Sequence, residues 1–400
     1  MSHEPAPPPK SFLGRYRLLA PTAAVKVSPL CLGAMNFGES WKGRLGECDK
    51  ETSFKILDTF YENGGNFIDT ANGYQNEESE AWVGEWMESR GVRDEIVLAT
   101  KYTSSFQAYN KSKLQPNFVG NNAKSLRVSV DASLRKLRTD YIDLFYVHWW
   151  DFSTSIEEVM TSLNQLVTSG KVIYLGISDT PAWVVSKANQ CKNTSLAHLK
   201  FLANKSSDAR DQGLRPFSVY QGQWNAARRD FERDIIPMCA SEGMGLCPWG
   251  ALGSGCFKTA SQREEIAEHG NPGRKGITRD IDIAVSDVLE KVALRHDTFI
   301  TSVALAYVMK KFPYVSPIVG GRKVEHLLGN IEALGLQLED SDIDEIEAAY
   351  DFDLGFPMSF LFRGENKEAH PKNSTFLVGA ARMDYPDMIR PPTVKSLDQA

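Results

Sequence analysis

The chain has 400 residues, of which 42% are hydrophobic, and it carries a formal net charge of −6. A chain of this length can bury a sizeable core. Its mild acidity and scattered basic residues exclude the clustered positive surface that nucleic acids or anionic membranes would need. The six cysteines lie far apart without a C-x-x-C pair. We therefore expect neither a disulfide scaffold nor a bound metal.

Residues 1–24 are expected to form a loosely packed tail. Met1–Lys10 is polar and rich in proline, and it lacks the apolar stretch of a secretory signal. No segment approaches the roughly 18 apolar residues of a membrane span. We therefore expect a protein of the cytoplasm without a membrane contact.

Strands and helices alternate from residue 25 onward. Nearly continuous apolar runs, typical of a parallel sheet buried on both faces, predict strands at 27–35, 67–71, 96–101, 142–148, 172–178, 217–221, 246–252 and 315–320. Helical periodicity predicts helices at 49–63, 77–89, 121–137, 156–169, from 182 onward, and at 231–241, 281–295, 300–311, 324–334 and 342–351. Asp49 is expected to cap the first of them.

Eight strand–helix units in series favour an α/β fold of the (β/α)8 TIM-barrel type over 25–350, with extra helices and a C-terminal extension over 351–400. The alternative is a doubly wound sheet. That fold would normally carry G-x-G-x-x-G after its first strand, and the motif is absent from this sequence.

Three successive strands of this barrel end in Asp69, Lys101 and His148, and Tyr74 follows Asp69 by five residues. Barrel enzymes place their chemistry at these strand ends, so we expect the four side chains to converge. An ammonium beside Tyr74 would lower the pKa of the phenol from its usual value near ~10. His148 could hydrogen-bond a carbonyl oxygen. Such a site suits carbonyl reduction, in which hydride reaches carbon while Tyr74 protonates oxygen.

The order and the strand-end placement of Asp69, Tyr74, Lys101 and His148 resemble the tetrad of the aldo-keto reductases. The resemblance covers about 25–350, which is most of the chain. It implies that Tyr74 donates the proton, that Lys101 and Asp69 tune it, and that His148 orients the substrate.

The same resemblance implies an NADP(H) cofactor. Ser178 and Gln221 resemble residues that hold the nicotinamide carboxamide, as does Asp179, which stands where the family usually has Asn. Trp249 matches the aromatic residue that stacks on the nicotinamide ring. Glycines would let backbone N–H groups approach the pyrophosphate. The resemblance assigns further cofactor contacts to Met35, Asp69, Gly250, Ala251, Leu252, Gly253, Gly255 and Lys258.

A second anion site resembles the one that binds the adenosine 2′-phosphate. It comprises Gly320, Gly321, Arg322 and His326, and it precedes a predicted helix whose N-terminus would favour an anion. His326 stands where the family often has Arg, so NAD stays an alternative, and His326 would bind phosphate better below its pKa. Asn330 would meet the adenine edge.

The long C-terminal extension 351–400, Trp149-Trp150 after His148, and Gln223-Trp224-Asn225 resemble the fungal aryl-alcohol dehydrogenase and norsolorinic acid reductase group. The resemblance implies an aromatic aldehyde or aryl ketone as substrate, in lignin-aromatic or secondary metabolism. Tyr74, His148, Trp149 and Trp224 are the expected substrate contacts. Trp150, Phe106 and Tyr109 either complete that pocket or belong to the core, and the apolar run 356–362 is expected over the mouth. The sequence leaves a homodimer open.

Cys191–Asp208 interrupts the helix that begins at residue 182, and we hypothesise that it is a retained intron. Cys191-Lys192 can be encoded TGT-AAG, which contains a GTAAG donor, and Ser207-Asp208 can be encoded TCA-GAC, which contains a CAG acceptor. A surface loop is the alternative. Sequencing of the cDNA distinguishes the two.

Two other functions stay open. A lysine at a barrel strand end can form a Schiff base, so Lys101 could serve an aldolase, although Asp69 beside it favours a charged lysine. A weakly catalytic subunit that senses NADP(H) for a partner protein is the second alternative.

Overall fold

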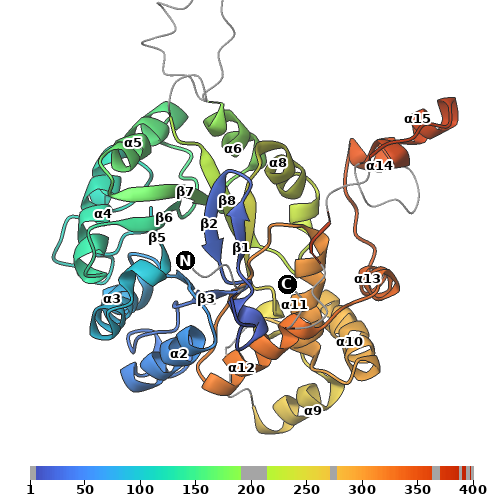
Figure 1. Cartoon of the computed structure of the whole chain (residues 1–400), viewed down its shortest axis with the longest axis horizontal. Coiled ribbons are helices and arrows are strands. Elements are labelled where there is room, and N and C mark those ends of the chain that lie inside the picture. The colour runs from blue at the N-terminus through green and yellow to red at the C-terminus, as the bar shows by residue number, and fades with distance from the viewer. Residues whose placement is uncertain are drawn as a thin grey trace, which may run out of the picture.

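The computed structural model describes residues 6–190, 214–270, 277–362, 370–386, 390–392 and 397. Eight parallel strands form the barrel in the order β10-β3-β4-β5-β6-β7-β8-β9 (Figure 1). Leu246 of β9 pairs with Val315 in a parallel bridge just before β10, which closes the ring. The expected (β/α)8 barrel is confirmed. Its strands are β3 (Cys31–Gly33), β4 (Phe67–Asp69), β5 (Val97–Tyr102), β6 (Ile142–Val147), β7 (Val172–Ser178), β8 (Phe217–Gln223), β9 (Gly245–Trp249) and β10 (Ile318–Val319).

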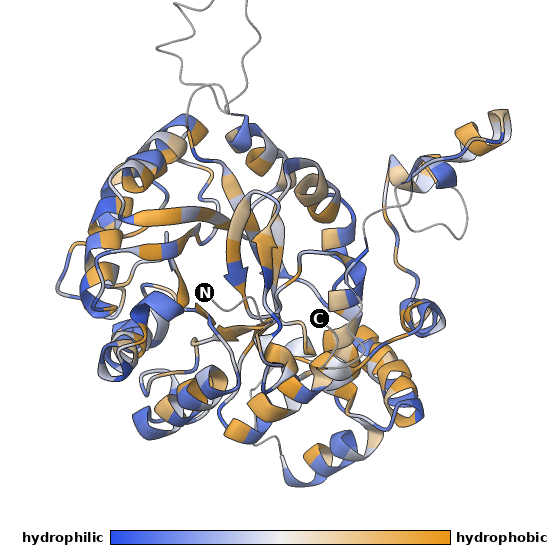
Figure 2. Ribbon diagram, viewed as in Figure 1, coloured by the Kyte–Doolittle hydropathy of each residue, from blue (hydrophilic) through white to orange (hydrophobic). Residues whose placement is uncertain are grey.

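Helices surround the strands, and their outward faces are the more hydrophilic (Figure 2). In α5 the Ser155 hydroxyl accepts from the backbone N–H of Glu158 at 3.2 Å, and Gly170 follows the helix at φ +74°. Asp49 caps α2, as expected, by accepting from the backbone N–H of Thr52 at 2.8 Å. The helices are α1 (Lys42–Leu45), α2 (Lys50–Glu62), α3 (Glu78–Arg90), α4 (Ala123–Lys136), α5 (Ile156–Thr168), α6 (Ala182–Asn189), α8 (Ile235–Glu242), α9 (Ala260–His269), α10 (Asp280–Arg295), α11 (Ile300–Lys311), α12 (Val324–Glu332), α13 (Asp340–Glu347), α14 (Met358–Leu361) and α15 (Thr375–Ala380).

The expectation of a loosely packed N-terminal tail is wrong for the segment that precedes the barrel. Strands β1 (Arg17–Ala20) and β2 (Ala23–Val27) pair as an antiparallel hairpin. Leu19 is buried against apolar residues of the barrel interior, including Val219. The hairpin therefore covers the end of the barrel opposite the strands' C-terminal ends, where interior side chains would otherwise meet water (Figure 1).

Helix α9 is absent from the sequence-based expectations. Its residues are polar on every side, and none of them is buried, so it lacks the apolar stripe that reveals a helix. What marks its start is a capping box, in which Thr259 and Gln262 satisfy each other's backbone N–H groups.

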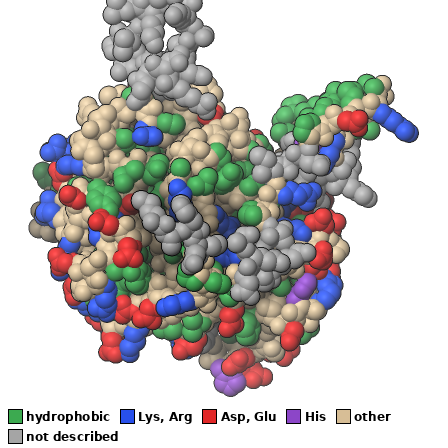
Figure 3. All heavy atoms as spheres, in the orientation of Figure 1, with side chains coloured by type: hydrophobic (Ala, Val, Ile, Leu, Met, Phe, Trp, Pro, Cys, Tyr) green, Lys and Arg blue, Asp and Glu red, His purple; other side chains and the backbone are tan. Residues whose placement is uncertain are grey.

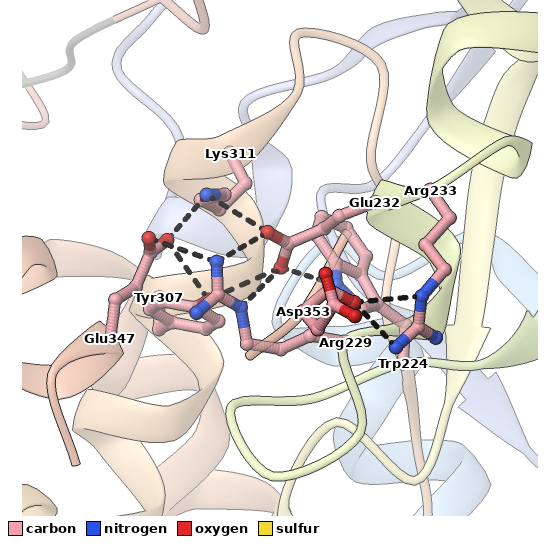
Figure 4. A network of polar contacts seen from close by, with 8 residues as sticks. All are labelled: Trp224, Arg229, Glu232, Arg233, Tyr307, Lys311, Glu347 and Asp353. Carbon is pink, nitrogen blue, oxygen red and sulfur yellow. Dashed lines mark hydrogen bonds and ion pairs between the residues drawn. The ribbon is translucent and has the colours of Figure 1, made fainter. Parts of the chain in front are cut away.

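A cluster of buried charges joins the loop after β8 to α11 and α13 (Figure 4). The Arg229 side chain is fully buried, and its guanidinium lies 2.7 Å from Glu232 and 2.9 Å from Glu347. Lys311 Nζ lies 2.5 Å from Glu347 and 3.4 Å from Glu232. The Tyr307 hydroxyl donates toward the same two carboxylates at 3.3 and 3.2 Å.

The C-terminal extension leaves the barrel beside this cluster. The Phe352 ring lies 4.6 Å from the guanidinium carbons of Arg229 and Arg233. Beyond it, α14 and α15 project away from the barrel and present apolar side chains to solvent (Figures 1 and 3). Phe356 is 85% exposed. The expectation that 356–362 covers the mouth is therefore wrong.

The interruption Cys191–Asp208 lies outside the described residues. Among the residues that the structure does describe, no helix is long and apolar enough to cross a membrane.

Candidate active site

A cavity of about 830 Å³ opens where the strands end. Its lining includes Asp69, Tyr74 and His148 together with all the expected cofactor residues except Ser178 and Gly253. Ser178 is fully buried as the last residue of β7. Gly253 lines a smaller cavity of about 220 Å³ that shares Arg44, Trp249 and Ser254 with the first.

Lys101 connects the acidic end of β4 to Tyr74. Its side chain is fully buried, and Nζ donates to Asp69 Oδ1 at 2.5 Å, to the Thr70 carbonyl at 2.7 Å and to Tyr74 Oη at 3.4 Å. Gln221 Nε2 donates to the second Asp69 oxygen at 3.0 Å. The phenol therefore lies beside an ammonium whose other partners hold it in place.

The turn after β4 brings Tyr74 to this position. The Asn72 backbone N–H donates to the Lys101 carbonyl at 3.1 Å, and the Tyr74 N–H donates to the Ala71 carbonyl at 3.2 Å. Gln75 and Asn76 follow with φ of 51° and 52°, in the left-handed region. A tight turn thus carries the ring back over the strand end.

His148 approaches Tyr74 from β6. The two ring centroids lie 5.8 Å apart, with their planes at 77°. Burial and the charge of Lys101 lower the pKa of His148 to about 3, so the imidazole is neutral near pH 7. Its Nδ1 is buried and has no hydrogen-bond partner among the described residues. A neutral imidazole here can donate one hydrogen bond to a substrate oxygen.

The expected lowering of the Tyr74 pKa is wrong for the protein without ligands. Burial raises the pKa of Tyr74, and this effect outweighs the lowering by Lys101. Burial opposes the charge of Lys101, but Asp69 and Tyr74 raise its pKa above the usual value. Lys101 is thus a charged, fully partnered ammonium, which disfavours the aldolase alternative because a Schiff base needs a free amine.

The residues around the cavity fit a phosphorylated dinucleotide. Gly250, Ser254 and Gly255 have φ of 72°, 53° and 90°, in the left-handed region, and the two glycines leave room for a ligand to approach the backbone. Lys258 and Arg322 supply positive charge in the lining.

The residues of the expected second anion site lie at the N-terminus of α12. A Cβ added to Gly320 would meet only the Gly33 carbonyl, at 3.5 Å, so the backbone there is open to a ligand. Burial, then Lys323 and Arg322, lower the pKa of His326. His326 is therefore neutral near pH 7, and Lys323 and Arg322 supply positive charge at this end.

Sequence reasoning missed the loop between β3 and α2. Trp41 and Arg44 both line the cavity. The Trp41 ring lies 6.2 Å from the Tyr74 ring at 69°, and its backbone N–H donates to Gln75 Oε1 at 2.7 Å. The available signal was a tryptophan and an arginine in the loop after the first barrel strand, since barrel loops at this end carry function.

One expected substrate contact is wrong. Trp224 is fully buried and stacks on Phe231 with ring centroids 5.9 Å apart, so it belongs to the core. Trp149 donates from Nε1 to Ser104 Oγ at 3.0 Å and does not line the cavity. Its contact with substrate stays a prediction. Trp150, Phe106 and Tyr109 are likewise absent from the lining.

Known proteins resemble this chain over most of its length. The sequence model of the aldo/keto reductase family matches residues 29–351. The chain is 61% identical over 347 residues to norsolorinic acid reductase B of Dothistroma septosporum, covering 86% of this chain and 84% of the relative. It is 57% identical over 357 residues to norsolorinic acid reductase A of Aspergillus parasiticus, covering 89% and 86%. It is 48% identical over 375 residues to aryl-alcohol dehydrogenase [NADP(+)] of Phanerodontia chrysosporium, covering 91% and 92%.

Proposed function

The chain belongs to the aldo/keto reductase family, and on that premise we propose that it interconverts aromatic aldehydes or ketones and the corresponding alcohols, with Tyr74 as the proton donor. Membership of the family confirms the expected class, an oxidoreductase that uses NADP(H). The observation that carries the proposal is the Tyr74 hydroxyl, which lines the cavity 3.4 Å from the Lys101 ammonium.

The proposed chemistry follows from the contacts of Tyr74. When bound, NADPH supplies a hydride to the carbonyl carbon. Tyr74 gives its phenolic proton to the carbonyl oxygen, so the product is a neutral alcohol. The ammonium of Lys101 stabilises the phenolate left behind, and Asp69 keeps that ammonium charged. In alcohol oxidation the phenolate takes the proton back.

His148 completes the proposed site by directing the carbonyl. Its neutral ring is close enough to Tyr74 for both groups to reach one oxygen. Two donors on the same oxygen fix the direction from which the carbon is attacked and stabilise the negative charge that develops there.

An aromatic substrate is favoured by the rings that line the cavity. Trp41 and Phe299 contribute to its lining, and flat rings stack well on aromatic carbonyl compounds. The names of the relatives point the same way, to norsolorinic acid and aryl alcohols. We therefore place the substrate among aryl carbonyls of fungal secondary metabolism.

The test is the loss of NADPH absorbance with a panel of aromatic and aliphatic aldehydes and ketones, with alcohol formation measured in parallel. We expect one alcohol per NADPH consumed and higher kcat/KM for aryl substrates. Tight NADPH binding without turnover on any of them would instead indicate a cofactor-sensing subunit. A covalent adduct of Lys101 trapped by borohydride would indicate an aldolase.

A further inference from the structure

Asp179 places a carboxylate in the cavity wall directly after β7. Its Oδ1 accepts from Trp249 Nε1 at 3.3 Å, and its Oδ2 accepts from Ser178 Oγ at 3.3 Å. Its backbone has φ +42°, a left-handed conformation that Asp adopts more readily than most residues. Its backbone N–H donates to the Gln221 carbonyl at 3.0 Å.

This carboxylate forms no ion pair with any Lys, Arg or His in the part of the chain that the structure describes. Both of its hydrogen-bond donors are neutral. Asp179 is exposed and lines the cavity, so a ligand that enters the cavity would displace water from this carboxylate, and a positively charged group on the ligand would offset that loss. The missing positive charge can come from a ligand, since Asp179 lines the cavity.

Asp179 is also electrostatically coupled to the reacting groups. Partial desolvation by the surrounding cavity wall raises the pKa of Asp179, and Trp249, Ser178 and the charge of Lys101 lower it in part. Tyr74 lines the same cavity. A carbonyl that accepts a proton from Tyr74 must lie within about 3–3.5 Å of its hydride donor. Gln221 links the two residues, because its carbonyl accepts from the Asp179 N–H and its Nε2 donates to Asp69. A nicotinamide ring beside Tyr74 would therefore lie in the part of the cavity that Asp179 lines.

We propose that Asp179 binds the oxidised nicotinamide ring more tightly than the reduced ring, and so makes the bound cofactor a stronger hydride donor. The proposal rests on the proposed function. The oxidised ring carries one positive charge and the reduced ring is neutral, so a nearby carboxylate attracts only the oxidised form. Tighter binding of the oxidised form lowers the reduction potential of the bound couple and favours carbonyl reduction.

The test compares dissociation constants for NADP+ and NADPH, measured by quenching of tryptophan fluorescence, in the wild type and in Asp179→Asn. Asn keeps the shape, tolerates the same φ and can accept from Trp249, but it is neutral. We expect the affinity for NADP+ to fall about tenfold relative to that for NADPH. For a two-electron couple this ratio corresponds to a rise of about 30 mV in the potential of the bound cofactor.

Glu325→Gln is the matched control. Glu325 lines the same cavity from α12, beside Arg322 and His326, so its charge faces the adenosine end. Its substitution should change both affinities by one factor and leave their ratio within about twofold. Asp179→Ser removes the same charge but has a different shape. If the charge is the cause, Asp179→Ser should change the ratio of NADP+ to NADPH affinity as Asp179→Asn does. A packing defect specific to Asn would not produce the same change in Asp179→Ser.

The outcomes separate this inference from the function on which it rests. A folded Asp179→Asn variant that binds both forms with the wild-type ratio would overturn the role of Asp179 and leave the reductase proposal standing. A wild-type protein that binds neither NADP+ nor NADPH would overturn both.

Discussion

Among the clusters of buried charge in the described part of this barrel, two surround a tyrosine. In the first, the Tyr74 hydroxyl lies 3.4 Å from the ammonium of Lys101 and lines the cavity. In the second, the Tyr307 hydroxyl lies 3.3 and 3.2 Å from two carboxylates, Glu232 and Glu347, and lines neither cavity (Figure 4). Burial, then Glu232 and Glu347, raise the pKa of Tyr307 well above its usual value.

This difference distinguishes the proposed catalytic site from a cluster that stabilises the fold. A cation beside Tyr74 stabilises the phenolate, so the proton can leave, and the cavity gives it somewhere to go. Anions beside Tyr307 oppose the phenolate, so that proton stays in a hydrogen bond that joins α11 to α13 and to the loop after β8. A cluster of buried charge therefore does not by itself identify a catalytic site in this fold.

The largest effect is expected from Lys101→Met. Removing the ammonium leaves Tyr74 without the charge that stabilises its phenolate, so kcat/KM for carbonyl reduction should fall about 10²–10⁴-fold. Lys311→Met is the matched control, because it removes a mostly buried lysine from the other cluster, and its kcat/KM per folded molecule should stay within about twofold of the wild type. Equal losses in the two variants would contradict the distinction between the clusters.

Arg229→Met should lower the stability of the protein, whereas Lys101→Met should lower its activity. It removes the guanidinium from between the buried carboxylates of Glu232 and Glu347 and leaves them beside Lys311, so the free energy of unfolding should fall by about 3–5 kcal/mol. Chemical denaturation measures this. Arg233→Met on the same loop removes a guanidinium that is 37% exposed and should cost no more than about 1 kcal/mol. An Arg229→Met variant with the wild-type free energy of unfolding would show that the second cluster does not stabilise the fold.

The pH profile of kcat/KM with saturating NADPH should have a single, alkaline limb. Tyr74 must be protonated to donate, so activity is present below its pKa and is lost as pH rises through it. Burial, opposed in part by Lys101, raises that pKa, so the limb should lie above that of a free phenol. His148, with its pKa lowered to about 3 by burial and Lys101, should add no limb between about pH 5 and 8. An acidic limb in that range that disappears in His148→Gln would refute a neutral imidazole.

The smallest effect is expected where the extension leaves the barrel. Phe352→Ala removes a ring that packs on two guanidinium groups and should lower the free energy of unfolding by about 1 kcal/mol without changing kcat. Phe356→Ala, at a side chain that is 85% exposed, should change neither. A change in kcat in either variant would mean that the extension reaches the site after all.

Strand-end residues could be predicted because they depend on local pattern. Asp69, Lys101 and His148 each end an apolar run, and parallel strands bring such ends together, so their convergence followed from the sequence. The direction of the Tyr74 pKa did not, because it depends on how much burial outweighs one nearby charge, and burial is a property of the whole fold.

Other parts of the molecule lacked a local signal. Arg229 meets Glu347 across more than a hundred residues of chain, and no spacing in the sequence links the two. Trp224 and Trp41 show the same limit of prediction from the sequence. Both are tryptophans next to a strand or loop at the mouth, yet Trp224 turns into the core and Trp41 lines the cavity. The Trp224 ring stacks on Phe231 and the Trp41 ring lies against Tyr74, and no local pattern in the sequence reveals these contacts.

The most direct measurement is single-turnover reduction of an aryl aldehyde by Tyr74→Phe, with NADPH affinity determined in the same preparation. The substitution removes one oxygen atom and keeps the ring in its place beside His148 and Trp41. The account predicts that the rate falls about 10²–10⁴-fold while the dissociation constant for NADPH stays within about twofold. A variant that reduces the aldehyde at close to the wild-type rate would show that the proton comes from another group.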